Sequence, residues 1–418
     1  MTRMPLPSRG PRGTATLPAA LAVSLVMLLF MGIVNGSLLT EQRLSANHLR
    51  SQAAFEAAEA GIDWMLGRLN AGDPVDDRCE AQSSAALPSF REQHAGWPDA
   101  QGAWTPPGLP VNCSAEGAGW ACWCGTLPAV GQTPPADTSA ATSSATFTVQ
   151  LRPGAPRDLL QVESAGCSNQ APPCASASGR GDAQAQVAVS VGHVPALAHL
   201  PAAALTVHGD LHLGAAAWML QRSQPAQGGM VLHTGGNVTA DRLSLRGPPG
   251  APAASTAVTS DPALRSADRG HTFSRLFRMD AASWQTLPTV HRVDCASACD
   301  SALRDAVGVG GHHTMLWLSG GLQLAGPLEL GSPTRPVLIV ADGPVLLAGP
   351  VVVHGFIYTT SPRWHAPAGA EVFGAVVAEG ALNGSGVTHI RHDALVLQIL
   401  HERTGTFLRV PGSWKDFE

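Results

Sequence analysis

The sequence predicts an α+β protein in which a long N-terminal helix precedes a small antiparallel sheet and a larger β-rich region. The first observation is an uncharged stretch, residues 14–40, that continues into a segment with apolar residues at three-and-four spacing up to residue 70. The second is a set of alternating segments between residues 145 and 191, which is typical of half-buried strands. The third is a series of short apolar segments separated by glycines after residue 199.

The first half of the helix is predicted to cross a membrane. Residues 15–34 are almost all apolar, and at about 1.5 Å per residue they just span the hydrocarbon core of a bilayer. Arg3, Arg9 and Arg12 precede this segment, and no acidic residue occurs before Glu41, which predicts a cytoplasmic N-terminus. Because no Ala-x-Ala site follows, an uncleaved or N-terminally trimmed anchor is favoured over a secretory signal peptide. An ordinary single-span anchor is the alternative.

The second half of the helix carries one apolar stripe. We expect it to pack against other helices or against its own domain. The helix is expected over residues 14–72, because Gly72 and Pro74 end the pattern. The residues predicted to mediate helix packing are Leu44, Leu49, Phe55, Ile62 and Leu66.

Composition sets the class of the rest of the chain. With 418 residues, the chain has room for one or two domains after the helix. Charged residues make up 14 % and the net charge is -5, so nucleic acid is not an expected partner.

The eight cysteines all follow the apolar segment, so the predicted topology places them in an oxidising compartment, and their even number favours disulfides. Close pairs such as Cys167 with Cys174 and Cys295 with Cys299 would staple local loops, while the other pairings stay open. Cys122-x-Cys124 lacks the usual spacing of a zinc knuckle, so no metal is expected. The disulfide candidates are Cys79, Cys113, Cys122, Cys124, Cys167, Cys174, Cys295 and Cys299.

Residues 73–198 are predicted to form a globular head on the helix. Residues 145–151 and 159–164 alternate in polarity and are expected to be adjacent strands, and residues 187–191 supply a third. A small antiparallel sheet laid against the long helix would use all three.

Residues 199–418 are predicted to form a separate β-rich domain. Gly326, Gly343 and Gly349 are each followed by a proline and a short apolar triplet, and Gly343, Gly349 and Gly355 are six residues apart. We favour a β-solenoid of stacked short strands over a β-meander, which would give a similar pattern. Helical spacing in residues 273–279 and 301–306 predicts a helical insertion at about residues 260–306.

The N-terminal region resembles that of PilX-type type IV pilus assembly proteins. The resemblance rests on Gly13 before a uniform apolar run, then Glu41-Gln-Arg-Leu-Ser-Ala-Asn47, then Ala54-Phe-Glu-Ala-Ala-Glu-Ala-Gly-Ile62. It implies that residues 1–13 are a basic leader, that prepilin peptidase cuts after Gly13, and that Thr14 becomes the first residue. Pro18 occupies the position at which major pilins carry a glutamate used in fibre assembly.

The resemblance implies a minor pilin-like component that acts in pilus assembly or priming and in tip adhesion. Its implied partners are other minor and major pilins and the inner-membrane pilus machinery. Its implied location is the bacterial inner membrane as a single-pass protein with a periplasmic C-terminal domain, or the pilus at the cell surface. Two alternatives are open: a minor pseudopilin of a type II secretion system, and a membrane-anchored envelope adhesin or carbohydrate-binding β-solenoid.

Enzymatic activity is not expected, and neither is a cofactor. Acid–base sites need clustered carboxylates, whereas the acids of the glycine-punctuated region are scattered. His389, His392 and Asp393 form a possible ligand trio, but satisfied polar residues in a turn are the favoured interpretation. The scattered acids are Glu329, Asp342, Glu371 and Glu379.

Overall fold

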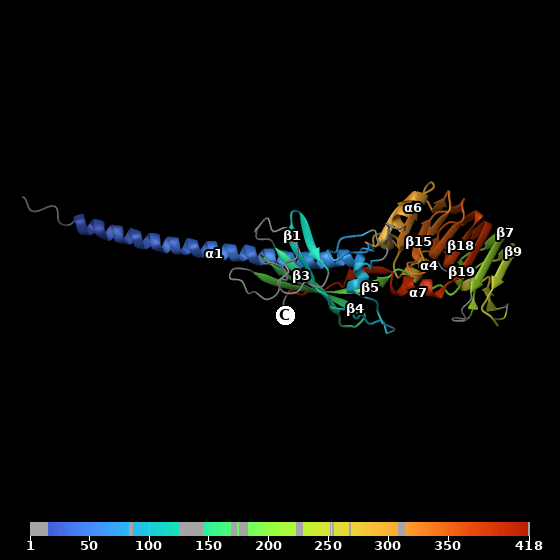
Figure 1. The fold of residues 1–418 in the computed structure, drawn as a ribbon, viewed down its shortest axis with the longest axis horizontal. Coiled ribbons are helices and arrows are strands. Elements are labelled where there is room, and N and C mark those ends of the chain that lie inside the picture. The colour runs from blue at the N-terminus through green and yellow to red at the C-terminus, as the bar shows by residue number, and fades with distance from the viewer. Residues whose placement is uncertain are drawn as a thin grey trace, which may run out of the picture.

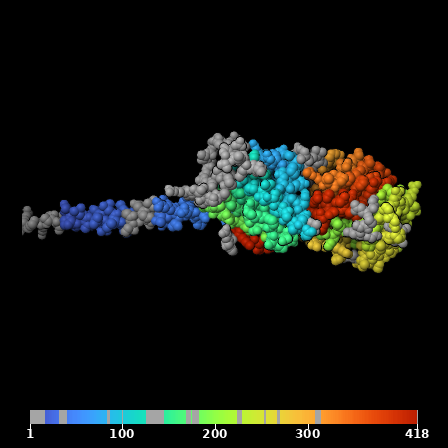
Figure 2. Space-filling view, turned by 60° about the horizontal axis from the view of Figure 1, so that its bottom comes forward, coloured from blue at the N-terminus to red at the C-terminus, as the bar shows by residue number. Residues whose placement is uncertain are grey.

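The computed structural model shows a mixed helix and sheet protein with two lobes on a long helix (Figures 1 and 2). It describes residues 16–82, 87–99, 101–124, 145–168, 174, 183–222, 229–250, 252, 255–266, 269–307 and 314–416, without the side chains of residues 16, 32–39 and 269. The lobe nearer the helix is called the head below, and the far lobe the stack domain. The predicted α+β class is confirmed.

Helix α1, Thr16–Asn70, is continuous over 55 residues. Its first half projects away from both lobes, and its second half runs through the head (Figure 1). Over the part of the chain that the structure describes, no helix combines the length and the apolar character needed to cross a membrane.

The head contains a six-stranded antiparallel sheet that packs on the second half of α1. Its order is β2-β1-β3-β4-β5-β20. Alternating burial along β4 shows that one face of the sheet forms a core with α1. The strands are β1 Val111–Glu116, β2 Gly119–Trp123, β3 Thr146–Pro153, β4 Leu159–Cys167, β5 Gln184–Pro195 and β20 Gly405–Arg409.

The last strand of the head comes from the far end of the chain. β20 pairs with β5 through Phe407 opposite His193, although sequence analysis assigns residues 405–409 to the β-rich domain. The stack domain is therefore inserted between two neighbouring strands of the head. Helix α2, Phe90–His94, adds a short cover that no pattern in the sequence predicts.

The stack domain is built from parallel strands that lie in three ladders. The first has the order β10-β8-β6-β18-β17-β15-β12-β11. The second runs through β13, β16, β18, β19, β7 and β9, and the third through β14, β17, β18, β19, β7 and β9. Neighbouring strands of a meander are antiparallel, so the parallel pairing supports the stacked alternative. The strands are β6 Leu205–Val207, β7 Leu211–Arg222, β8 Leu232–Thr234, β9 Val238–Arg246, β10 Ala257–Val258, β11 Val290–Asp294, β12 Met315–Ser319, β13 Leu322–Leu324, β14 Leu328–Leu330, β15 Val337–Asp342, β16 Val345–Leu347, β17 Val351–Thr359, β18 Arg363–Ala378 and β19 Leu382–His392.

The stacking order differs from the chain order. Successive turns rise from β11 to β19, and the next turn is formed by β6 and β7 from earlier in the chain. The six-residue glycine spacing measures one side of a turn, because β16 lies between Gly343 and Gly349 and the start of β17 between Gly349 and Gly355.

Helices cover the outer face of the first ladder. Phe273 and Phe277 of α4 and Trp284 of α5 pack on it together with Leu397 and Leu400 of α7, while its inner face lies in the core of the stack. α6 follows the Cys295–Cys299 disulfide and contacts β14. The helices are α3 Pro262–Ser266, α4 Arg269–Phe277, α5 Ala281–Gln285, α6 Asp300–Val307 and α7 Ala394–Glu402. The predicted insertion therefore contains helices, but also the edge strand β11.

Candidate assembly interface

The projecting part of α1 presents apolar side chains on all sides. Over residues 17–31 every described side chain is exposed. Their large apolar members are 55–69 % exposed, so none is buried by the protein itself. Apolar surface of this extent is unfavourable in water and favours a hydrocarbon environment or the packing of other apolar helices. These residues are Leu17, Leu21, Val23, Leu25, Val26, Met27, Leu28, Leu29, Phe30 and Met31.

The five predicted packing residues divide into two groups. Leu44 and Leu49 lie beyond the head and are 66 % and 64 % exposed. Ile62 is fully buried in the core of the head, and Phe55 and Leu66 are half-buried against it. Of these five residues, Leu44 and Leu49 therefore offer the most surface to another protein.

The block of small residues that carries the family resemblance has a physical role in the head. Ala54 and Ala58 are fully buried and lie against β4. A Cβ added at Gly61 would lie 2.2 Å from the Ser164 hydroxyl oxygen, and one added at Gly166 would lie 2.1 Å from the Ala54 carbonyl oxygen. The small residues therefore let helix and sheet approach at backbone distance.

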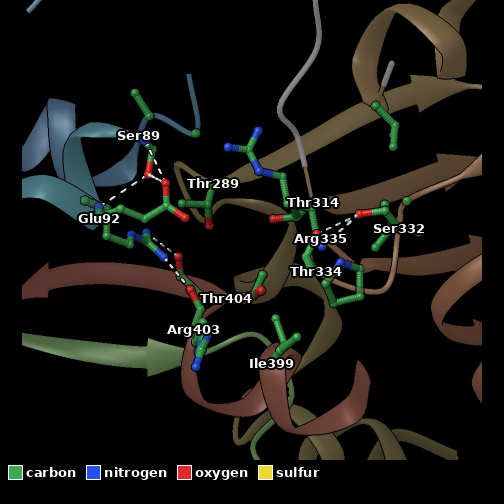
Figure 3. A pocket seen from close by; sticks show the side chains of 18 of the residues that line it. Ser89, Glu92, Thr289, Thr314, Ser332, Thr334, Arg335, Ile399, Arg403 and Thr404 are labelled. Atoms are coloured by element: carbon green, nitrogen blue, oxygen red, sulfur yellow. Dashed lines mark hydrogen bonds between the residues drawn. The ribbon is translucent and has the colours of Figure 1, made fainter. Parts of the chain in front are cut away.

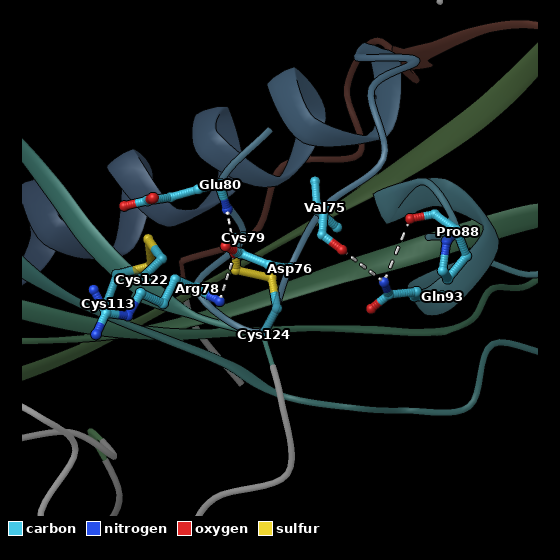
Figure 4. Close-up of a disulfide and its surroundings, with 10 residues drawn as sticks. All are labelled: Val75, Asp76, Arg78, Cys79, Glu80, Pro88, Gln93, Cys113, Cys122 and Cys124. Carbon is cyan, nitrogen blue, oxygen red and sulfur yellow. Dashed lines mark hydrogen bonds between the residues drawn. A yellow bond between two sulfur atoms is a disulfide. The ribbon is translucent and has the colours of Figure 1, made fainter. Parts of the chain in front are cut away.

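Disulfides fasten the strands of the head near α1. Cys79 pairs with Cys124, and Cys113 with Cys122 across β1 and β2 (Figure 4). The Asp76 carboxylate accepts hydrogen bonds from the Arg78 and Glu80 backbone, which holds the turn around Cys79. The predicted disulfide character is confirmed, including the close pairs Cys167–Cys174 and Cys295–Cys299.

A set of side-chain hydrogen bonds, called the latch below, joins the end of α1 and helix α2 to β20. The Asn70 amide donates to the Phe407 carbonyl at 2.9 Å and accepts from the Phe407 N–H at 2.8 Å, so the end of α1 pairs with β20 as a strand would. Arg91 of α2 donates to the carbonyls of Leu69 at 2.9 Å and of Gly405 at 2.8 Å. Its guanidinium also lies over the Phe407 ring.

A cleft of about 440 Å³ lies beside this latch. The walls of the cleft carry guanidinium and hydroxyl groups from both lobes (Figure 3). Burial lowers the pKa of Arg91, one of these residues, to about 10, although the charge of Glu92 opposes the shift. Guanidinium and hydroxyl groups hold oxygen-rich or anionic ligands. The charged and hydroxyl-bearing residues of the walls are Ser89, Arg91, Glu92, Thr289, Thr314, Glu329, Ser332, Thr334, Arg335, Arg403 and Thr404.

A second cavity, of about 660 Å³, is lined by histidines of the stack domain. His233 Nε2 lies 2.8 Å from the Asp261 carboxylate, His208 contacts the Thr272 hydroxyl, and His401 contacts the Leu197 carbonyl. Within the described ranges, no three His, Cys, Asp or Glu side chains are arranged to hold a metal ion.

His389, His392 and Asp393, the possible ligand trio of the sequence, make contacts within the fold. His392 hydrogen-bonds the Pro201 carbonyl at 3.0 Å, and Asp393 accepts from the first N–H groups of α7 as its N-cap. His389 lies 3.7 Å from Glu371. The predicted processing residues Gly13 and Thr14 lie outside the described residues.

Comparison with known proteins adds no relative. No protein-family model matches the chain. Neither a curated protein nor a solved structure matches it.

Proposed function

We propose that the protein is a membrane-anchored minor pilin-like subunit of the type IV pilus machinery, acting in assembly or priming. The observation that carries the proposal is the division of α1: residues 17–31 are apolar and exposed all round, whereas residues 54–70 are built into an antiparallel head. This division suits a subunit that stands in the inner membrane and packs its helix against other pilin helices. Residues 17–31 are the part of the expected span, residues 15–34, whose side chains the structure describes.

The stack domain at the opposite end from the projecting helix supports a terminal position (Figure 1). In our proposal it is too bulky to repeat along a thin fibre, and it extends away from the membrane, so a tip or priming complex suits it. Pro18, in place of the assembly glutamate, accords with a subunit of low copy number.

Site-specific cross-linking tests the proposal. A photo-reactive residue at Leu44 or Leu49, expressed in the native cell, should capture other pilins, because both side chains are exposed beyond the head. The same residue at Arg363, which is exposed on the stack domain, is the matched control. Capture of secretion-system pseudopilins would assign the protein to a type II secretion system instead of the pilus. Capture of no protein at either leucine would indicate that α1 is only a membrane anchor.

Deletion of the gene separates assembly from adhesion. Loss of surface pili supports the assembly role. Normal piliation with lost adhesion would instead support the free-standing adhesin.

A further inference from the structure

The two ends of the stack domain are closed to different extents. At the end formed by β11, β13 and β14, helix α6 covers the strands: it contacts β11 and β14, and its Leu303 is buried in the core. The Asp300 carboxylate accepts hydrogen bonds from the Ala325 N–H at 3.0 Å and the Gly326 N–H at 2.9 Å, just after β13. The fold itself therefore supplies a cover at this end.

The opposite end carries β9, which lies at the end of the stack domain farthest from the projecting helix (Figure 1). Among the residues that the structure describes, β9 pairs with β7 and with no other strand. A strand directs N–H and C=O groups to both sides, so the second edge of β9 is free to pair within this part of the chain. β9 contains no proline, and the residues that it packs against the core are all apolar. It therefore lacks the proline and the inward-pointing charge that commonly block pairing at an edge.

The core of the stack is incomplete at β9. Val238 and Leu245 pack against the core but are only half-buried. Their partners in β7, Leu211 and Leu220, are fully buried, because β9 covers them. A further strand with apolar side chains next to Val238 and Leu245 would remove the remaining apolar surface from water.

A step at this end determines what can lie on β9. β6 and β7 belong to one turn, β8 and β9 to the next, and β10 pairs with β8 as the beginning of a third. The described part of the first ladder is thus one strand higher than the two ladders that end at β9. A second copy placed end to end by a two-fold axis would bring two β10 strands into the single layer between two β9 strands, and a head-to-tail copy would meet α6. One extended segment fits beside β10 instead.

The side chains of β9 indicate the composition of that segment. Arg242, Ser244 and Arg246 are exposed, and they alternate with the half-buried Leu243 and Leu245. Side chains directly opposite each other in paired strands lie on the same face. A segment with acidic residues opposite the two arginines and apolar residues opposite the two leucines therefore complements β9. Because this pattern is symmetric about Ser244, it fits in either strand direction.

The charge of β9 stays positive when its one acid is counted. Asp241, Arg242 and Arg246 are all exposed. Within the described residues, none of the three takes part in an ion pair of 4.0 Å or less. Charges of this kind contribute more to specificity than to affinity. Main-chain hydrogen bonds and the apolar contacts would supply most of the binding energy.

We propose that β9 binds an extended segment of another protein, in which acidic and apolar residues alternate, and that this segment adds to the stack as a further strand beside β10. Its apolar side chains lie next to Leu243 and Leu245, and its acidic side chains lie opposite Arg242 and Arg246. The far end of the stack domain is thus a docking site for a partner protein. This inference does not rest on the proposed function, because it needs only the stack domain.

Peptide binding to the full-length protein in detergent micelles, measured by fluorescence anisotropy, tests the proposal. The probes are labelled peptides with Ser-Gly on each side of Glu-Val-Thr-Val-Glu, of its scramble Val-Val-Glu-Glu-Thr, or of Lys-Val-Thr-Val-Lys. We expect the acidic alternating peptide to bind at least tenfold more tightly than the other two, and to slow hydrogen exchange of the β9 amides. In R242E/R246E the preference should invert in favour of the lysine peptide. R363E, which alters an exposed arginine of β18, should keep the native preference.

Several results would overturn the proposal: no binding of the acidic peptide at millimolar concentration, equal binding of its scramble, or slower exchange only at amides outside β9. An unchanged preference in R242E/R246E, with folding verified by circular dichroism, would also overturn it. Sedimentation of the native protein as a dimer that R242E/R246E dissociates would place a second copy on β9 instead of a partner's segment.

Discussion

The head and the stack domain solve the same problem, the burial of a sheet, in opposite ways. In the head, β4 alternates between buried and half-buried residues because α1 covers one face of the sheet. In the stack domain, five of the six residues of β15 are buried because helices cover one face and the core of the stack the other. Sheets covered on one face alternate in sequence, and sheets covered on both faces read as continuous apolar runs.

The two lobes also differ in how the chain closes them. The head needs both ends of the chain, because α1 comes from the beginning and β20 from residues 405–409. The stack domain also joins early and late strands, since β6 pairs with β18, but all its strands lie within the insertion. Three disulfides are in the head, including one that closes a loop of 45 residues, and one is in the stack domain. The head therefore depends more on covalent closure.

Removal of the longest disulfide loop should have the largest effect. In the chain-entropy model, loss of Cys79–Cys124, with a separation of 45 residues, lowers the free energy of unfolding by about 4 kcal/mol. Loss of Cys295–Cys299, with a separation of 4, lowers it by only about 2 kcal/mol. The double variants C79A/C124A and C295A/C299A should be compared by urea unfolding.

Hydrogen exchange by mass spectrometry locates the two effects. Exchange should increase in the head for the first variant and near α6 for the second. Equal losses of stability in the two variants would show that covalent closure does not distinguish the lobes.

The close stacking of strands in the stack domain gives the next largest effect. A Cβ on Gly374 would lie 1.8 Å from the Gly355 carbonyl oxygen, and its φ of 146° disfavours other residues. We expect G374A to lower the free energy of unfolding by about 3 kcal/mol. Gly67 in α1 has open space around it, so G67A should instead stabilise by about 0.5–1 kcal/mol. A destabilised G67A beside an unaffected G374A, measured by urea unfolding, would refute the packing described for both lobes.

Much of the secondary structure could be predicted from local pattern. The long helix, the strands β3, β4 and β5, and the helices α4 and α6 lie where periodicity predicts them. β1, β2 and α2 could not be predicted, because proline and serine interrupt the pattern around them and packing on α1 determines their structure. β20 was assigned to the wrong lobe, because pairing with β5 is a tertiary event without a local signal.

The sites were predictable only in part. Leu44 and Leu49 follow from the apolar stripe, yet the same stripe includes Ile62, which is buried in the head. Arg91, Arg335 and Arg403 are far apart in sequence, and only the junction of the two lobes brings them to one cleft. The small residues from Ala54 to Gly61 were visible as a motif, and their role became clear only from the approach of β4.

Acid should weaken the head through a buried histidine. His94 is 1 % exposed and stacks on Phe90 at 4.2 Å, and burial lowers its pKa to about 4. The unfolded chain binds this proton near pH 6.5, so it holds more protons than the folded protein between about pH 6.5 and 4. Stability is therefore lost as the pH falls through this window, by about 2 kcal/mol at pH 5 for this group.

The variant H94F keeps an aromatic ring at this position and cannot be protonated. Urea unfolding at pH 7 and pH 5 should show a smaller loss of stability in H94F than in the native protein, with exchange rates in the head less dependent on pH. H48F, which alters an exposed histidine of α1, should keep the native dependence. An unchanged pH dependence in H94F would assign the acid sensitivity to other groups, such as His208 and His392 of the stack domain, whose pKa values burial also lowers.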